Sequence, residues 1–235
     1  MPRSFKNSFV KKSIVAITAV LTFATIGCNP QPVDPVSQKE PAVRPEPAPE
    51  VKSQVDQLRA AGASIALLEN GQPDLVDLYN VAEAPELMDI VATLHETRAL
   101  VLSGTNCGDD DLAKLSALAN LTDLSLNGTS ITDAGLKHLA HFPKLERLNL
   151  NETDVSDDGL AVIRQLPELQ RIMLHRTRVS DAGLHHINDH KALEVVWLTG
   201  SLVTQIGADQ LKQERSEMSI TFEMLDANVS EEEIY

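Results

Sequence analysis

The sequence predicts an α/β fold in which short strand–helix units stack on one another. A fourteen-residue stretch, LNGTSITDAGLKHL at 126–139, has near copies at 150–163 and 174–187, so successive copies are 24 residues apart. The apolar columns of these copies continue on both sides of them. Aromatic residues make up only 3% of the chain, so the core must be aliphatic. Such periodicity is typical of units that each cover the open face of the one before.

The first 27 residues are predicted to be an export signal. Four basic residues precede an apolar run at 14–26, and its 13 positions fall short of a bilayer span of about 20 residues. The run ends in Thr-Ile-Gly-Cys, which resembles the lipobox of bacterial lipoproteins, although Thr25 replaces the usual Leu. This resemblance implies cleavage before Cys28 and attachment of a diacylglyceryl group to its sulfur. Ordinary signal cleavage, which leaves Cys28 unmodified, is the alternative.

Residues 28–50 are predicted to be an extended tether that starts at the lipidated cysteine. Positions 29–50 contain seven of the 12 prolines of the chain and almost no large apolar side chain. This composition cannot bury a core and favours polyproline II. A ligand for a proline-recognition domain is the alternative reading of the same segment.

Residues 51–78 are predicted to cap the N-terminal end of the stack. The apolar spacing of 51–62 indicates a helix, and 64–78 is typical of two strands around the turn dipeptide Asn70-Gly71. At the other end, residues 217–235 are predicted to form a last strand, at 218–222, and an acidic tail.

Between these ends, residues 73–216 are predicted to form about six repeats of 24 residues. In one of them, Leu124 and Leu126 alternate as in a strand with both side chains inward, and Thr129 lies at a bend where its hydroxyl can satisfy backbone groups. Thr132-Asp133 then provides an N-cap and an acid in the first helical turn.

The inward columns recur at every step of the period, which is the strongest feature of the sequence. The strand columns include Leu121-x-x-Leu124-x-Leu126, Leu145-x-x-Leu148-x-Leu150, Leu169-x-x-Ile172-x-Leu174 and Leu193-x-x-Val196-x-Leu198. The helix columns include Leu112, Leu136, Leu160 and Leu184, and also Leu115, Leu139, Ile163, Ile187 and Leu211. One unit alone cannot bury enough apolar surface to offset the entropy of fixing its backbone, so the units must stack.

These columns resemble the leucine-rich repeat, L-x-x-L-x-L-x-x-N/C-x-L, with Thr at the Asn/Cys position. The resemblance covers about residues 73–222. It implies a right-handed superhelix of the ribonuclease-inhibitor-like type, with parallel strands on the concave face and helices on the convex face. It also implies protein recognition as the function, in a chain that is similar to bacterial leucine-rich-repeat lipoproteins.

No residue pattern indicates a reaction, and we expect no enzyme activity and no cofactor. Cys107 lies in a column of Ile and Val and is predicted to be a buried packing thiol. His186 and His190, at i and i+4, could hold a metal ion, but His186 is expected to point outward and His190 to be partly buried, so no metal site is predicted. The net charge of −14 argues against nucleic acid as a partner.

The outward residues of the strands give the candidate binding site. They combine arginines, amides and the only Trp of the chain, and they are Arg147, Asn149, Asn151, Arg171, Met173, His175, Arg176 and Trp197. Trp and Arg are enriched at interface hot spots. Alternatively, such polar groups belong to any exposed row of strand residues, and Trp197 merely covers the fading end of the core.

The sequence therefore predicts an extracytoplasmic lipoprotein that binds an unidentified protein through its concave face. A module that binds a glycan or a cell-wall polymer, with Trp197 as a stacking platform, and a purely structural envelope component are the alternatives. The expected location is the cell envelope, anchored in a membrane through the lipid. Asn29 after Cys28 favours the outer membrane by analogy with the lipoprotein family, because it is not the Asp that signals inner-membrane retention.

The lipid anchor can be tested by replacing its attachment point. We expect Cys28→Ala to move the protein from the membrane fraction to the soluble fraction, because two or three acyl chains anchor a protein stably and their loss removes that affinity. Fractionation followed by immunoblotting measures the partition. A mutant that stays with the membranes would count against lipidation.

Overall fold

The computed structural model of the chain describes residues 48–223. The predicted signal peptide, Cys28, nearly all of the predicted tether and the acidic tail after residue 223 lie outside these residues. Within residues 48–223, no helix has the length and apolar character needed to cross a membrane.

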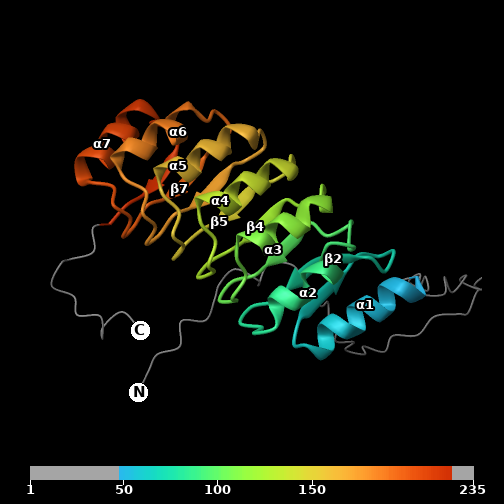
Figure 1. Cartoon of the computed structure of the whole chain (residues 1–235). Coiled ribbons are helices and arrows are strands. Elements are labelled where there is room, and N and C mark those ends of the chain that lie inside the picture. Colours follow the sequence, from blue (N-terminus) through green and yellow to red (C-terminus); the bar gives the residue numbers. More distant parts are fainter. Residues whose placement is uncertain (1–47, 224–235) are drawn as a thin grey trace, which may run out of the picture. The chain divides into compact units, whose positions relative to one another are not determined.

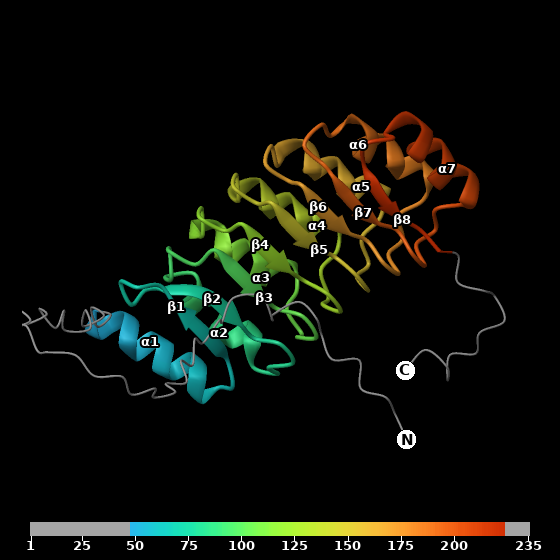
Figure 2. The same ribbon diagram turned by 180° about the vertical axis from the view of Figure 1, so that it is seen from behind.

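Eight strands form one sheet and follow one another in chain order (Figure 2). The first two strands are antiparallel, and each later strand pairs in parallel with the one before it. The strands are β1 (Ser64–Leu67), β2 (Pro73–Asp77), β3 (Ala99–Val101), β4 (Asp123–Ser125), β5 (Arg147–Asn149), β6 (Arg171–Met173), β7 (Val195–Trp197) and β8 (Ser219–Thr221).

The register of the parallel strands advances by one repeat per strand. Leu100 lies beside Leu124, Leu124 beside Leu148, and Leu148 beside Ile172, so each partner is 24 residues further along the chain. The sequence period is therefore the spatial period of the sheet, as predicted. The α/β solenoid expected from the sequence is confirmed.

Helices cover one face of the sheet and leave the other face open (Figures 1 and 2). The α-helices are α1 (Pro49–Ala60), α2 (Ala84–Val91), α3 (Asp109–Lys114), α4 (Asp133–Leu136), α5 (Asp157–Leu160), α6 (Leu184–Asp189) and α7 (Gln205–Glu214). The 3₁₀ helices are η1 (Leu115–Ala117), η2 (Lys137–His141), η3 (Ala161–Gln165) and η4 (Asp181–Gly183).

The helical segment of a central repeat is an α-helical turn joined to a 3₁₀ turn, where the sequence predicted one helix. Leu136, Leu139 and Phe142 are three residues apart, and all are buried. A 3₁₀ helix has three residues per turn, so this spacing keeps every apolar side chain on the sheet side. The split follows from the spacing of the apolar residues.

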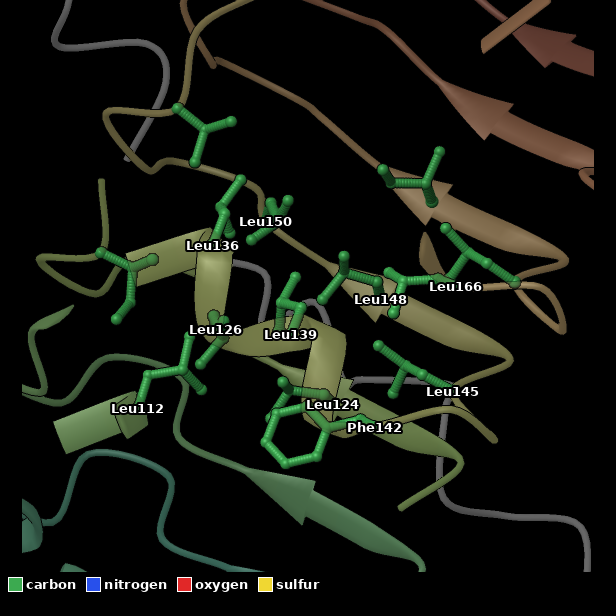
Figure 3. Packing of buried hydrophobic residues seen from close by; sticks show 14 of the residues in the cluster. Leu112, Leu124, Leu126, Leu136, Leu139, Phe142, Leu145, Leu148, Leu150 and Leu166 are labelled. Carbon is green, nitrogen blue, oxygen red and sulfur yellow. The ribbon is translucent and has the colours of Figure 1, made fainter. Parts of the chain in front are cut away.

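The core lies between the sheet and the helices and is aliphatic (Figure 3). Leu124 and Leu126 from the strand side and Leu136 and Leu139 from the helix side are each at most 2% exposed. Phe142 closes the layer at the end of η2 and is fully buried. Each repeat contributes both walls of this layer, so the core continues from one repeat to the next.

The threonine column satisfies the backbone at the bend after each strand. The Thr129 hydroxyl donates to the Leu126 carbonyl at 2.7 Å, and Thr153 donates to Leu150 at 2.6 Å. The same bond occurs at Thr105, Thr177 and Ser201. A buried carbonyl without a partner is costly, so a hydroxyl at this position stabilises the turn. This prediction is confirmed.

The aspartate at the start of each helix has a function that the sequence analysis missed, because it joins two repeats. Asp133 accepts the Ser156 amide at 2.8 Å and the Ser156 hydroxyl at 2.5 Å. Asp157 does the same with Ser180, at 2.8 and 2.6 Å. Asp109 bonds Thr132 in the same way, and Asp181 bonds Thr204. Each acid therefore fixes the N-cap residue of the following repeat.

The glycine two positions after each aspartate column makes room for the acid of the preceding repeat. A Cβ atom on Gly159 would lie 2.2 Å from Oδ1 of Asp133, and one on Gly183 would lie 2.3 Å from Oδ1 of Asp157. A side chain at either glycine would therefore displace the carboxylate of the preceding repeat from its position, so the glycine leaves room for the acid.

The series of aspartate links ends where the residue types in the aspartate and glycine columns change. In the repeat that contains α3, the position equivalent to Gly135 holds Asp111, whose carboxylate accepts the Gly108 amide at 3.0 Å. In the last repeat the aspartate position holds Gln205, which hydrogen-bonds Asp209 within its own helix. The residue types at the two ends thus mark where the series of aspartate links begins and stops.

A helix and a hairpin lie at the N-terminal end of the described stack, and a last strand lies at its C-terminal end. β1 and β2 form the hairpin, with Gly71 at φ 78° in its turn. The N-terminal helix begins at Pro49, two residues inside the predicted tether, because proline suits the first turn of a helix. At the C-terminal end, Arg215 is buried and donates to four backbone carbonyls, those of Ile187, Asn188, His190 and Leu193.

The aspartate link predicts a large difference between two adjacent acids. We expect Asp157→Ala to lower the free energy of unfolding by about 2–3 kcal/mol, because two hydrogen bonds to a charged group are lost. Asp158 is exposed and serves as the matched control, and Asp158→Ala should change the value by less than about 0.5 kcal/mol. Urea denaturation measures both, and equal effects would contradict the link.

Candidate functional site

Strand alternation places the predicted site residues together on the open face of the sheet. Arg147 pairs in register with Arg171, Asn149 with Met173, and Met173 with Trp197. All eight predicted residues are partly exposed. We call this set the strand-face patch: Arg147, Asn149, Asn151, Arg171, Met173, His175, Arg176 and Trp197. It spans β5, β6 and β7 and the bends that follow them.

Trp197 belongs to the open face of the sheet. Its chain neighbours Val196 and Leu198 are fully buried, while the indole points to the other side between Met173 and Thr221. The alternative that Trp197 covers the fading end of the core does not match this placement.

The two asparagines of the strand-face patch already hold the backbone with their carbonyl oxygens. Oδ1 of Asn149 accepts the Asn151 amide at 3.0 Å, and Oδ1 of Asn151 accepts the His175 amide at 2.8 Å. Within residues 48–223, neither side-chain NH₂ group makes a hydrogen bond. These asparagines therefore offer donors, and few acceptors, to a ligand.

Two of the three arginines in the patch have an acidic partner one repeat earlier. Arg147 makes a two-pronged pair with Asp123, in which Nη2 and Oδ2 are 2.8 Å apart. The hydrogen bond to Asp123 raises the pKa of Arg147. Nη1 of Arg176 lies 3.5 Å from Oε1 of Glu152. The patch is therefore less basic than its sequence indicates.

Arg171 differs from the other two arginines. Its register neighbours are Arg147 and Val195, so a like charge lies beside it where Arg147 has an acid. Within the described part of the chain, no carboxylate comes within salt-bridge distance of Arg171. Like charges directly opposite on adjacent strands destabilise a sheet.

Two charged residues at the edge of the patch, Glu152 and Arg176, occupy a backbone position that favours glycine. The position just before the bend threonine column has positive φ in six successive units, and Gly104, Gly128 and Gly200 occupy three of them and Asn80 a fourth. Glu152 adopts φ 56° and Arg176 adopts φ 52°, a conformation that costs a non-glycine residue about 1–2 kcal/mol. Strain that is retained next to an exposed patch is a mark of functional sites.

The sequence analysis missed two exposed apolar side chains near this end of the stack. Leu202 is 63% exposed and Ile206 is 79% exposed. A comparison of equivalent positions in the repeats could have found them, because the other repeats hold polar or small residues there. The positions equivalent to Leu202 are Asn106, Ser130, Asp154 and Arg178, and those equivalent to Ile206 are Asp110, Ala134, Asp158 and Ala182. They lie outside the strand face, Leu202 in the segment before α7 and Ile206 in the first turn of α7.

The other candidates for chemistry lie away from the open face. Cys107 is 1% exposed, and burial raises the pKa of its thiol, so the predicted packing function is confirmed. His190 is buried, as expected, and its Nε2 lies 3.0 Å from the Leu166 carbonyl. His186 does not simply point outward: its Nδ1 is buried, and burial lowers the pKa of the ring. Among residues 48–223, no three His, Cys, Asp or Glu side chains are grouped so that they could hold a metal ion.

Two shallow hollows occur on the described surface, and neither includes a residue of the strand-face patch. One is lined by residues that include Asn70, Gln72 and His95, and the other by residues that include Arg164, Asp189 and His190.

Comparison with known proteins supports the fold. No protein-family description and no curated protein sequence matches the chain. Among solved structures, the chain is similar to the leucine-rich-repeat ectodomain of the Arabidopsis receptor kinase HAESA, determined in complex with a peptide hormone ligand, with a TM-score of 0.51 and 14% identity. The match covers 74% of this chain and 33% of that one, so the chain spans about a third of its length. The fold is a leucine-rich-repeat solenoid.

The charge pattern predicts opposite effects for two neighbouring arginines. We expect Arg147→Gln to lower the free energy of unfolding by up to about 1 kcal/mol, because the pair with Asp123 is lost. Arg171→Gln should leave it unchanged or raise it slightly, because it removes only a like-charge contact. Thermal and urea denaturation at low salt measure both, and a clear loss of stability in Arg171→Gln would show that its charge has a structural partner.

Proposed function

We propose that this chain is a non-enzymatic, extracytoplasmic leucine-rich-repeat lipoprotein that binds another protein through the strand-face patch. One observation carries the proposal: Arg171, Met173 and Trp197 lie together on the uncovered face of the sheet. Trp, Met and Arg are the residue types enriched where proteins meet. The helices cover the opposite face, so this face is available to a partner.

The form of the patch favours a protein over a small molecule. Small ligands are usually bound in concave pockets that enclose most of their surface, whereas the patch lies on three neighbouring parallel strands and lines neither of the two hollows described above. The ectodomain to which the fold is similar was solved with a peptide bound, which is one use of such a fold. Within the described residues, the one thiol is buried in the core, which supports a binding function rather than a catalytic one.

A glycan partner remains the second candidate, because the free NH₂ groups of Asn149 and Asn151 could donate to sugar hydroxyls beside Trp197. The indole is only partly exposed, however, and this limits the area on which a sugar ring could stack. The proposed membrane attachment through Cys28 would hold the patch in the cell envelope, and Asn29 favours the outer membrane. The net charge of −14 separately argues against nucleic acid as a partner.

Site-specific photo-crosslinking tests the proposal. A photoreactive amino acid at Met173 should give covalent adducts with a protein in intact cells, because this side chain lies at the centre of the patch. The same amino acid at Ala161, which is exposed on η3 on the helix side, is the matched control and should give none. Gel shifts and mass spectrometry identify the adducts.

Equal labelling from both positions, or none from Met173, would contradict protein binding by the patch. Binding to a glycan array that is lost on Trp197→Ala would favour the second candidate instead.

A further inference from the structure

The strand-face patch contains one charge whose partner is not within the described part of the chain. Arg98 pairs with Asp74, Arg147 with Asp123 and Arg176 with Glu152, and in each case the acid lies 24 residues earlier in the chain. The residue 24 positions before Arg171 is Arg147. The repeat pattern that supplies an acid to every other strand-face arginine therefore supplies a like charge here.

Arg147 is already paired with Asp123, so it offers Arg171 no counter-charge, and the other two strand-face neighbours of Arg171 are neutral. Val195 lies on the far side of Arg171 in register, and Met173 is the next outward residue along β6. A guanidinium has five donors in a planar fork that fits a carboxylate in two-pronged geometry. The group that complements Arg171 best is thus a carboxylate from outside the described residues, and a partner can supply it.

An apolar subsite lies beside this cation. Met173 and Trp197 are register partners on β6 and β7, and both are partly exposed. A flexible thioether next to an indole suits a large apolar side chain. Arg171 and Met173 are two residues apart on one strand, which corresponds to about 6.6 Å. In an extended polypeptide, side chains at i and i+2 lie on one side with the same spacing.

We infer that the partner contributes an extended segment with an acidic side chain that pairs with Arg171 and, two residues away, a large apolar side chain that contacts Met173 and Trp197. The inference rests on the proposed function and specifies its ligand. A polypeptide fits better than an acidic glycan, because the spacing matches a strand and the indole is only partly open. The charge on Arg171 gives specificity, and the apolar subsite gives contact area.

The test uses the full chain in a non-ionic detergent and the fluorescence of Trp197, the only Trp of the chain. The probe is the blocked peptide Gly-Glu-Ser-Phe-Ser-Glu-Gly, which presents an acid two residues from Phe in either chain direction. The control peptide has Gln in place of both Glu residues. We expect the acidic peptide to bind about tenfold more tightly at low salt, as one well-placed charged pair can provide.

The variants assign this preference to one side chain. In Arg171→Gln, the two peptides should bind within about twofold of each other, because the donor fork is gone. Arg164→Gln, which removes an exposed arginine on η3 away from the sheet, should keep the wild-type preference. The unchanged or higher stability expected for Arg171→Gln separates loss of binding from loss of folding.

Three results would overturn the inference: absence of binding by the acidic peptide, equal binding of both peptides to the wild type, or a preference that persists in Arg171→Gln. Arg171-dependent binding of a uronic-acid oligosaccharide without peptide binding would also overturn it, in favour of a glycan. If Met173 gives protein adducts in cells that Arg171→Gln leaves undiminished, the proposed function stands and this inference fails.

Discussion

One carboxylate per repeat, hydrogen-bonded to the backbone and hydroxyl of the next repeat, holds the solenoid together at its helical edge. Apolar burial drives the units together but is not directional, so it does not by itself fix how one repeat sits on another. The aspartate link is directional, because Asp133 must meet both the amide and the hydroxyl of Ser156. The glycine opposite each acid completes the link, since no other residue leaves room for the carboxylate.

This division of labour leaves the other face of the sheet free for recognition. Packing, threonine hydroxyls and aspartate links are confined to the inward columns, the bends and the helix starts, so most of the cohesion of the fold does not depend on the outward strand positions. Those positions hold a methionine, the only Trp of the chain and an arginine that has no acidic partner among residues 48–223, and two residues with positive φ border them. Such a group of residues in neighbouring repeats is expected when residues are retained for function.

The repeat period, the inward columns, the hairpin and the face that carries the candidate site could all be predicted, because each depends on spacing along the chain. The aspartate link could not, because the local cap geometry already accounts for an acid after Ser156, and its actual partner lies 23 residues further on. The pairing between outward side chains was missed for the same reason, because Asp123 and Arg147 are 24 residues apart and meet only when neighbouring repeats are placed side by side. The exposure of Leu202 was also missed, because it shows only when Leu202 is compared with the polar residues at the same position of the other repeats.

A double-mutant cycle on Asp181 and Gly207 tests the link most directly, because every close contact of a Cβ on Gly207 is with Asp181. In the wild-type background, Gly207→Ala should destabilise the protein by about 1–3 kcal/mol, since the carboxylate must leave Thr204. In the Asp181→Ala background the same change should be neutral or stabilising by up to about 1 kcal/mol, the ordinary gain of alanine over glycine in a helix. The same effect of Gly207→Ala in both backgrounds would contradict a link between the two repeats.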